Sequence, residues 1–298
     1  MEIEFAPPGP VEGEPLSAIA TPVFEGLVLT SDGEALDQAA GGALSRALAG
    51  SRVTGARGQT ADLLAPAGVH ALRIVLVGAG PRKDFDESAI ETLAANAYQA
   101  VKLSGATSLE LRLGDPSSQD AARAAFGARL AAYRFDRYLT AEKPEKKPSI
   151  AKVRVICADP DAAAAAFEPL AALADAVIFA RDLVSEPANI LYPEEFARRV
   201  KMLGELGLEV EVLGEAQMAE LGMGSLLGVG QGSVRESQLA VLTWRGAADP
   251  KAAPIAFVGK GVCFDSGGIS IKPAQGMEEM KTDMGGAAAV AHQPVSSS

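Results

Sequence analysis

Apolar residues recur along the first half of the chain in two patterns, short continuous runs and helical three-to-four-residue spacing. The first pattern is typical of strands in a sheet, and the second of helices that cover the sheet. Strands are predicted at Leu72–Gly78 (LRIVLVG), Ser108–Leu113 and Lys152–Ile156, and helices at Glu87–Leu103 and Gln119–Tyr133. Their alternation predicts an α/β domain that ends near Cys157.

The second half begins with an alanine-rich helical pattern over Asp161–Leu183, which would connect two domains. Pro193 then opens a helix that runs to about Leu206, with Glu194 and Glu195 at its positive dipole end. Further elements follow along the chain. They are a strand at Leu208–Leu213, a short helix at Glu215–Leu221, a glycine-rich turn at Leu226–Ser233, and strands at Gln238–Trp244 and Pro254–Val258.

Composition fits a globular protein and argues against nucleic acid as a partner. Hydrophobic residues make up 48% and charged residues 22% of the 298 residues, and the formal charge is −11. A protein this acidic lacks the overall basic potential that phosphate backbones require. The charged, proline-containing stretch Ala141–Ser149 (AEKPEKKPS) is predicted to be a surface loop.

Targeting and metal signals of the usual kinds are not found. The stretch MEIEFAPPGP lacks the basic start and apolar core of a signal peptide, and no apolar run suggests a membrane span. We therefore expect a cytoplasmic protein without a membrane partner. Cys157 and Cys263 are too far apart for a zinc knuckle and are expected to be reduced core thiols. The two histidines, His70 and His292, form no metal or catalytic motif.

Gly78-Ala79-Gly80 follows a predicted strand and raises the possibility of a nucleotide site. A dinucleotide loop needs a third glycine that opens a helix, whereas Pro81, Arg82 and Lys83 follow here. A tight turn is the preferred interpretation.

The segment from Val258 to Ala287 (VGKGVCFDSGGISIKPAQGMEEMKTDMGGA) places four charges among glycines and apolar residues: Lys260, Asp265, Lys272 and Asp283. Lys260 follows a predicted strand, where burial would favour a neutral amine that can bind a metal. Asp265 and Asp283 could then neutralise a divalent cation, while Lys272 steadies an oxyanion. The alternative is two salt bridges, Lys260–Asp265 and Lys272–Asp283, that tie loops together.

The same segment closely resembles the leucyl (cytosol) aminopeptidase family, a group of di-metal peptidases. Further resemblance lies at Arg181–Asn189 (RDLVSEPAN), Tyr192–Ala197 (YPEEFA) and Leu221–Ser233. The resemblance implies an N-terminal α/β domain, a connecting helix and an α/β/α catalytic domain, of which this chain holds the first part. We assign residues 1–157, 158–183 and 184–298 to these three parts.

The resemblance also implies roles for individual residues. Lys260 and Asp283 would bind one of two divalent metals (Mn, Zn or Mg), Asp265 would bridge both, and Lys272 would be catalytic. Met280 would line the pocket for the substrate's N-terminal side chain. The expected substrates are peptides with a free amino terminus, and the expected assembly is a homohexamer.

One departure from the family bears on activity. The family's downstream N-T-D-A-E-G-R signature, which completes both metal sites, has no counterpart in these 298 residues, and HQPVSSS follows Ala291. We therefore expect a truncated or frame-shifted member that is inactive by itself. The alternatives are a non-catalytic module for binding or assembly and, less favoured, a nucleotide-binding domain built on Gly78 and Gly80.

Overall fold

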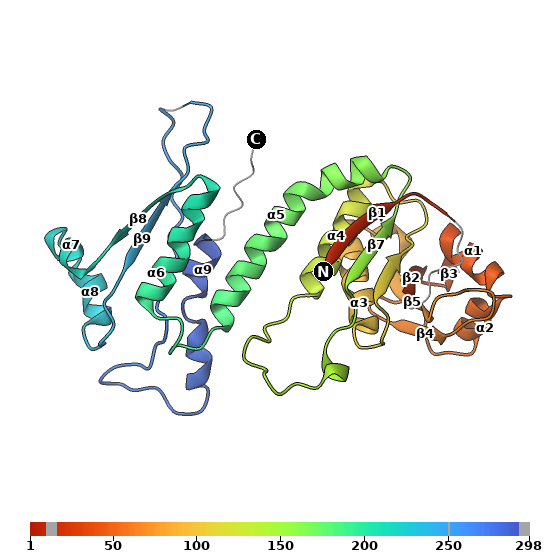
Figure 1. Cartoon of the computed structure of the whole chain (residues 1–298), viewed down its shortest axis with the longest axis horizontal. Helices are drawn as coiled ribbons and strands as arrows, with labels where there is room; N and C mark the ends of the chain where they lie inside the picture. The colour runs from red at the N-terminus through yellow and green to blue at the C-terminus, as the bar shows by residue number, and fades with distance from the viewer. Residues whose placement is uncertain (10–16, 250, 292–298) are drawn as a thin grey trace. The chain divides into compact units, whose positions relative to one another are not determined.

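The computed structural model describes residues 1–9, 17–249 and 251–291. The chain divides into two compact units, Met1–Ala174 (unit 1) and Asp175–Ser298 (unit 2). Helix α5 (Pro160–Ser185) belongs to both (Figure 1). The expectation about the HQPVSSS stretch concerns residues 292–298, which lie outside the described part of the chain.

Unit 1 is built on a seven-stranded sheet with the order β1-β7-β6-β2-β5-β4, and β3 pairs with β2 beside this path. Strands β1, β7, β6, β2 and β5 are parallel, whereas β4 and β3 are antiparallel to their neighbours. The strands are β1 (Glu2–Ala6), β2 (Ser17–Phe24), β3 (Val28–Leu29), β4 (Thr60–Leu64), β5 (Arg73–Gly80), β6 (Ser108–Leu111) and β7 (Lys152–Ile156).

Helices cover both faces of this sheet, as the alternation along β2 shows. Ala18 and Ala20 pack with α3 (Glu87–Val101), α4 (Ser118–Ala131) and the first half of α5. Ile19 and Val23 point to the other face, against α1 (Ser31–Ala39) and α2 (Ala43–Ala49). Because side chains alternate along a strand, a strand covered on both faces is apolar throughout rather than every second residue.

Unit 2 contains a smaller sheet of two antiparallel strands, β8 (Glu209–Leu213) and β9 (Leu239–Thr243). Its buried cluster includes Leu183, Phe196, Val200 and Met284. The helices of this unit, after α5, are α6 (Pro193–Lys201), α7 (Glu215–Glu220), α8 (Gly224–Gly230) and α9 (Gly285–Ala291), with 3-10 turns η3 (Met202–Leu206) and η4 (Met277–Thr282).

The predicted α/β fold is confirmed, and most predicted elements lie within a few residues of their expected bounds. Two predictions in unit 2 are wrong. The glycine-rich stretch Leu226–Ser233 is largely helical, since α8 ends at Gly230; glycine disfavours a helix by about 1 kcal/mol but does not forbid it. Pro254–Val258 forms no strand, because no described strand pairs with it, and all five residues are exposed.

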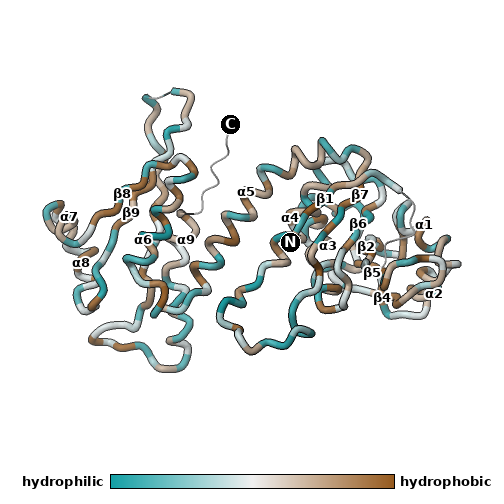
Figure 2. Tube along the Cα trace, viewed as in Figure 1, coloured by the Kyte–Doolittle hydropathy of each residue, from teal (hydrophilic) through white to brown (hydrophobic). Residues whose placement is uncertain are grey.

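The expectation about membrane-spanning segments also needs correction. Among the described residues, α5 is long and apolar enough to cross a membrane by length and composition. Figure 2 shows apolar colour along much of α5. The sequence analysis missed this helix as a candidate span because many of its apolar residues are alanines. One such helix is weak evidence, since the core helix of a soluble protein meets the same criteria.

Candidate active site

The four charged residues singled out in the sequence come together in unit 2 as two crossed pairs. Lys260 Nζ lies 2.8 Å from Asp283 Oδ1, and Lys272 Nζ lies 3.2 Å from Asp265 Oδ2. The alternative pairing considered from the sequence, Lys260–Asp265 and Lys272–Asp283, is therefore wrong. The positive charge of Lys260 also helps to lower the pKa of Asp265, which indicates that the two pairs are neighbours.

Backbone contacts explain how Lys260 reaches Asp283 across 23 positions of the chain. The Ala287 N–H, in the first turn of α9, donates to the Lys260 carbonyl over 2.8 Å. A Cβ on Gly259 would lie 2.5 Å from the Gly286 carbonyl oxygen, so only glycine permits this approach. The 258–261 segment is thus held against the start of α9, and Asp283 lies two residues before that helix.

The second pair is positioned by a tight loop. The Lys272 N–H donates to the Ser266 carbonyl at 3.0 Å, and the Gly267 N–H donates to Asp265 Oδ1 at 2.9 Å. Gly267 has φ +96°, a conformation that favours glycine. The Gly267 hydrogen bond, followed by that of Lys272, lowers the pKa of Asp265 and keeps it ionised.

The expectation of a buried, neutral Lys260 is wrong for this structure. Its side chain is 57% exposed, and the hydrogen bond to Asp283 raises its pKa, so the ammonium form is favoured. The physical reason is that the preceding segment 254–258 is not a buried strand. Lys260 therefore holds a proton at Nζ where the sequence had suggested a free amine.

Asp283 is one of the residues with a buried side-chain atom that no described group satisfies. Its side chain is 19% exposed, and its Oδ2 atom is buried without a hydrogen-bond partner among the described residues. A buried carboxylate oxygen without a partner is unfavourable unless a cation or donor reaches it. Among the described residues no group of three or more His, Cys, Asp or Glu side chains converges, so a metal here would also need Lys260.

A groove of about 680 Å³ lies beside Lys272. Phe264, Ile271 and Met277 provide apolar walls, and Lys281 lies at its edge, where Nζ donates to the Ser185 carbonyl over 3.4 Å. Met280, expected to contact a substrate side chain, is half-buried on η4 but does not line this groove. Met277, which lines the groove, was not singled out in the sequence. Its position three residues before Met280 could have indicated it.

The remaining sequence candidates have structural explanations. The Gly78 N–H donates to Gln59 O and the Gly80 N–H to Gly55 O, so neither is available to a phosphate. A Cβ on Gly78 would lie 2.0 Å from Ala56 O, which explains the glycine as a close backbone approach. The tight-turn interpretation is wrong, because Gly78, Ala79 and Gly80 are the last residues of strand β5. Their backbone hydrogen bonds to the 55–59 segment do not support a nucleotide site on these glycines.

Both cysteines are free and buried, as predicted. Burial, followed by the charge of Glu194, raises the pKa of Cys263 to about 11, so this thiol is a poor nucleophile. Burial also raises the pKa of Cys157. His70 is exposed on unit 1, and no role for it follows.

Comparison with known proteins supports the resemblance seen in the sequence. The model of the cytosol aminopeptidase family, catalytic domain, matches residues 178–295, and that of the family's N-terminal domain matches residues 20–142. A probable cytosol aminopeptidase of Caulobacter vibrioides is 63% identical over 291 residues, which cover 98% of this chain and 59% of that protein. One of Methylorubrum populi is 49% identical over 249 residues, covering 82% and 49%.

Solved structures similar to this chain include a leucine aminopeptidase. A mutant of tomato leucine aminopeptidase superposes with a TM-score of 0.82 at 26% identity, covering 98% of this chain and 58% of that one. The bottromycin maturation enzyme BotP in complex with Mn gives a TM-score of 0.68 at 31% identity, covering 92% and 54%. The chain spans about half the length of the curated relatives and solved chains that it matches.

Proposed function

Because the chain belongs to the cytosol aminopeptidase family, a family of metalloaminopeptidases, we propose that it derives from a leucyl aminopeptidase that releases N-terminal amino acids from peptides. The observation that supports this at the level of residues is the convergence of Lys260, Asp265, Lys272 and Asp283. The proposed substrates are peptides with a free amino terminus. The proposed location is the cytoplasm, after the names of the relatives, and the proposed assembly is a homohexamer.

Lys260, Asp265 and Asp283 are the residues that we propose to hold divalent metal, with Asp265 shared between two ions. The partnerless Oδ2 of Asp283 supports this, because a cation would satisfy it. The complex of BotP contains Mn, which makes Mn²⁺ the first ion to test, with Zn²⁺ and Mg²⁺ as alternatives. Bound metal would supply charge that polarises a peptide carbonyl and acidifies water.

The chain's own residues would provide the remaining functions, namely metal binding, hydrogen bonding to the substrate oxygen and contact with the substrate side chain. Lys260 must release the Nζ proton that it now shares with Asp283, so metal binding competes with protonation at this atom. Lys272 pairs with Asp265 and would donate a hydrogen bond to negative charge that develops on the substrate oxygen. Met280 would contact the substrate's N-terminal side chain.

We further propose that the 298-residue polypeptide by itself binds metal weakly and does not turn over peptides. Three ligands are proposed here, and no N-T-D-A-E-G-R-like stretch is present to add others. The alternative function is a non-catalytic binding or assembly module. Exposed apolar side chains in unit 2, including Ile255, Phe257 and Val258, favour that alternative, because such surface is typical of interaction sites.

Calorimetric titration with Mn²⁺ tests the metal proposal without requiring activity. We expect binding heat from the 298-residue chain and its loss in Asp283→Asn. Glu279→Gln is the matched control, since it removes an exposed carboxylate from the same turn. Equal binding by both variants would show that Asp283 is not a ligand. Hydrolysis of leucine p-nitroanilide with Mn²⁺ tests the second claim, and robust turnover by this polypeptide would contradict it.

A further inference from the structure

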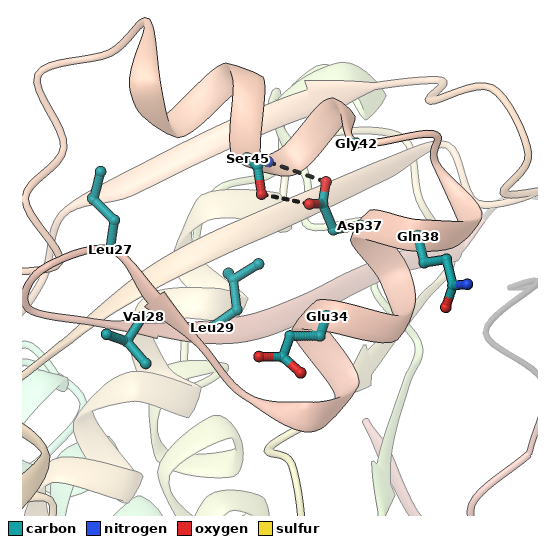
Figure 3. Close-up of a pocket in the computed structure, with 8 residues that line it drawn as sticks. All are labelled: Leu27, Val28, Leu29, Glu34, Asp37, Gln38, Gly42 and Ser45. Carbon is teal, nitrogen blue, oxygen red and sulfur yellow. Dashed lines mark hydrogen bonds between the residues drawn. The ribbon is translucent and has the colours of Figure 1, made fainter.

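Two surface cavities, one in each unit, differ in whether their charged groups already have partners. The first is a pocket of about 430 Å³ beside the β2–β3 hairpin of unit 1 (Figure 3). Its Asp37 carboxylate accepts hydrogen bonds from the Ser45 side chain and from the Leu44 N–H. Its other carboxylate, Glu34, is exposed and therefore open to water. The charged groups of this pocket thus do not require a ligand.

The second cavity is the groove of about 680 Å³ beside Lys272 in unit 2, a size typical of small-molecule sites. Most of the residues that line it are apolar, and the charged ones are Lys272, Glu278 and Lys281. Lys272 pairs with Asp265, whereas Glu278 is exposed and forms no ion pair within the described residues. The groove therefore combines apolar walls with a net positive lining.

Lys281 is the cation of this groove whose charge no carboxylate of the described residues balances. Its side chain is half-buried on η4, and its Nζ donates to the Ser185 carbonyl over 3.4 Å. Ser185 is the last residue of α5, where the negative end of the helix dipole favours a cation. An ammonium group has three N–H donors, and the described residues use one of them. Lys281 is therefore held at the groove with donors left for an anion.

A ligand for this groove must match both its apolar walls and its cation. Apolar walls favour a hydrophobic side chain, because binding removes apolar surface from water. An ammonium without a counter-charge favours a carboxylate, which accepts a charge-assisted hydrogen bond from it. The C-terminal residue of a short peptide carries both groups when its side chain is apolar. Inorganic phosphate would supply the anion but would leave the apolar walls uncovered.

We propose that the groove binds the C-terminal residue of short peptides, with Lys281 bound to the free carboxylate and the apolar walls in contact with the side chain. This inference rests on the proposed function and narrows its substrate class, because Lys272 beside the groove would contact the peptide bond that is cleaved. Met280, proposed for the substrate's N-terminal side chain, does not line the groove, so different residues would contact the two ends of the peptide. Lys281 is thus a specificity-determining residue that favours peptides with a free, apolar C-terminal residue.

Calorimetric titration of the 298-residue chain with Leu-Phe and with Leu-Phe amide tests the proposal directly. The two dipeptides share the amine and both side chains, and they differ only in the charge of the C-terminal group. EDTA is present, so that no metal assists binding and neither dipeptide is hydrolysed. We expect Leu-Phe to bind at least tenfold more tightly than its amide. Equal affinity for the two, or no binding of Leu-Phe, would overturn the proposal.

Substitutions at the groove separate binding of the carboxylate from support of the local structure. Lys281→Gln should lower the affinity for Leu-Phe to that for the amide and leave the affinity for the amide unchanged, whereas Lys281→Arg should retain the preference. Lys201→Gln is the matched control, since Lys201 is exposed on the same unit and does not line the groove. Ile271→Asn should weaken both dipeptides equally, because both contact the apolar wall. Equal weakening of both by Lys281→Gln would mean that Lys281 is only structural and would refute the proposal.

The Mn²⁺ titration distinguishes failure of this proposal from failure of the proposed function. Mn²⁺ binding that depends on Asp283, without a preference for Leu-Phe, would remove the carboxylate site and leave the metal proposal standing. A preference for Leu-Phe that depends on Lys281, without Mn²⁺ binding, would support the carboxylate site and contradict the metal proposal.

Discussion

Arg199 illustrates how one side chain joins two elements of unit 2. It lies 3.0 Å from Glu186, whose side chain has no exposed surface, and 2.7 Å from Glu195 on its own helix. Arg199→Ala should destabilise unit 2 by about 3 kcal/mol, because it removes a counter-charge from a buried carboxylate. Arg198→Ala is the control: Arg198 also pairs with Glu195 but is 62% exposed, so its loss should cost below about 1 kcal/mol. Urea unfolding followed by fluorescence of Trp244, the single tryptophan, compares the two variants.

Glu195 makes the same network sensitive to pH. Its hydrogen bond with Arg198, and then that with Arg199, lowers its pKa from 4.5 to about 2. A lowered pKa means that the folded protein favours the charged carboxylate, so the stabilisation is complete above pH 4.5 and disappears as pH falls toward 2. Glu195→Gln should therefore be less stable than the unchanged chain at pH 6 and approach it at low pH. A constant difference between the two across pH 3–7 would contradict this assignment.

At the scale of elements, helix packing in unit 1 depends on a single glycine. Gly127 lies in α4 where a Cβ would fall 2.2 Å from the Glu91 carbonyl oxygen of α3. Gly127→Ala should force the two helices apart and destabilise unit 1 by about 2 kcal/mol, in spite of alanine's higher helix propensity. Gly228 in α8 has no neighbour within 4 Å of such a Cβ, so Gly228→Ala should stabilise slightly. Thermal unfolding followed by circular dichroism tests both, and a stable Gly127→Ala variant would contradict the close approach.

Elements with strong local periodicity were predictable from the sequence, and those that depend on neighbours were not. The α6 helix begins at Pro193 as predicted, because proline and two glutamates favour a first turn. The sequence analysis did not predict strand β2, because Pro22 argues against a central strand. The structure explains the exception: β6 pairs only with Ser17–Ala20, so Pro22 lies where β2 has one neighbour instead of two. Conversely, the pattern of Pro254–Val258 predicts a strand, but no strand in the described part of the chain pairs with it.

The same limit applies to the candidate site. The sequence singled out the four charged residues that the fold brings together, because charges among glycines are conspicuous. It did not indicate their pairing, since sequence proximity favours Lys260 with Asp265, whereas the fold joins Lys260 to Asp283 through α9. Nor did it predict the charged state of Lys260, which depends on a sheet environment that segment 254–258 lacks.

At the scale of the whole molecule, the two units differ in how much structure supports them. Unit 1 encloses a seven-stranded sheet between helices, with buried clusters on both faces. The described residues of unit 2 form two strands and one small buried cluster, and two-stranded sheets are only marginally stable. We therefore expect unit 2 to open first, so that hydrogen exchange measured by mass spectrometry is fast in peptides of β8 and β9 and slow in those of β2 and β5. The difference should persist at low protein concentration, where self-association is lost. Equal protection in the four strands would show that the units unfold together.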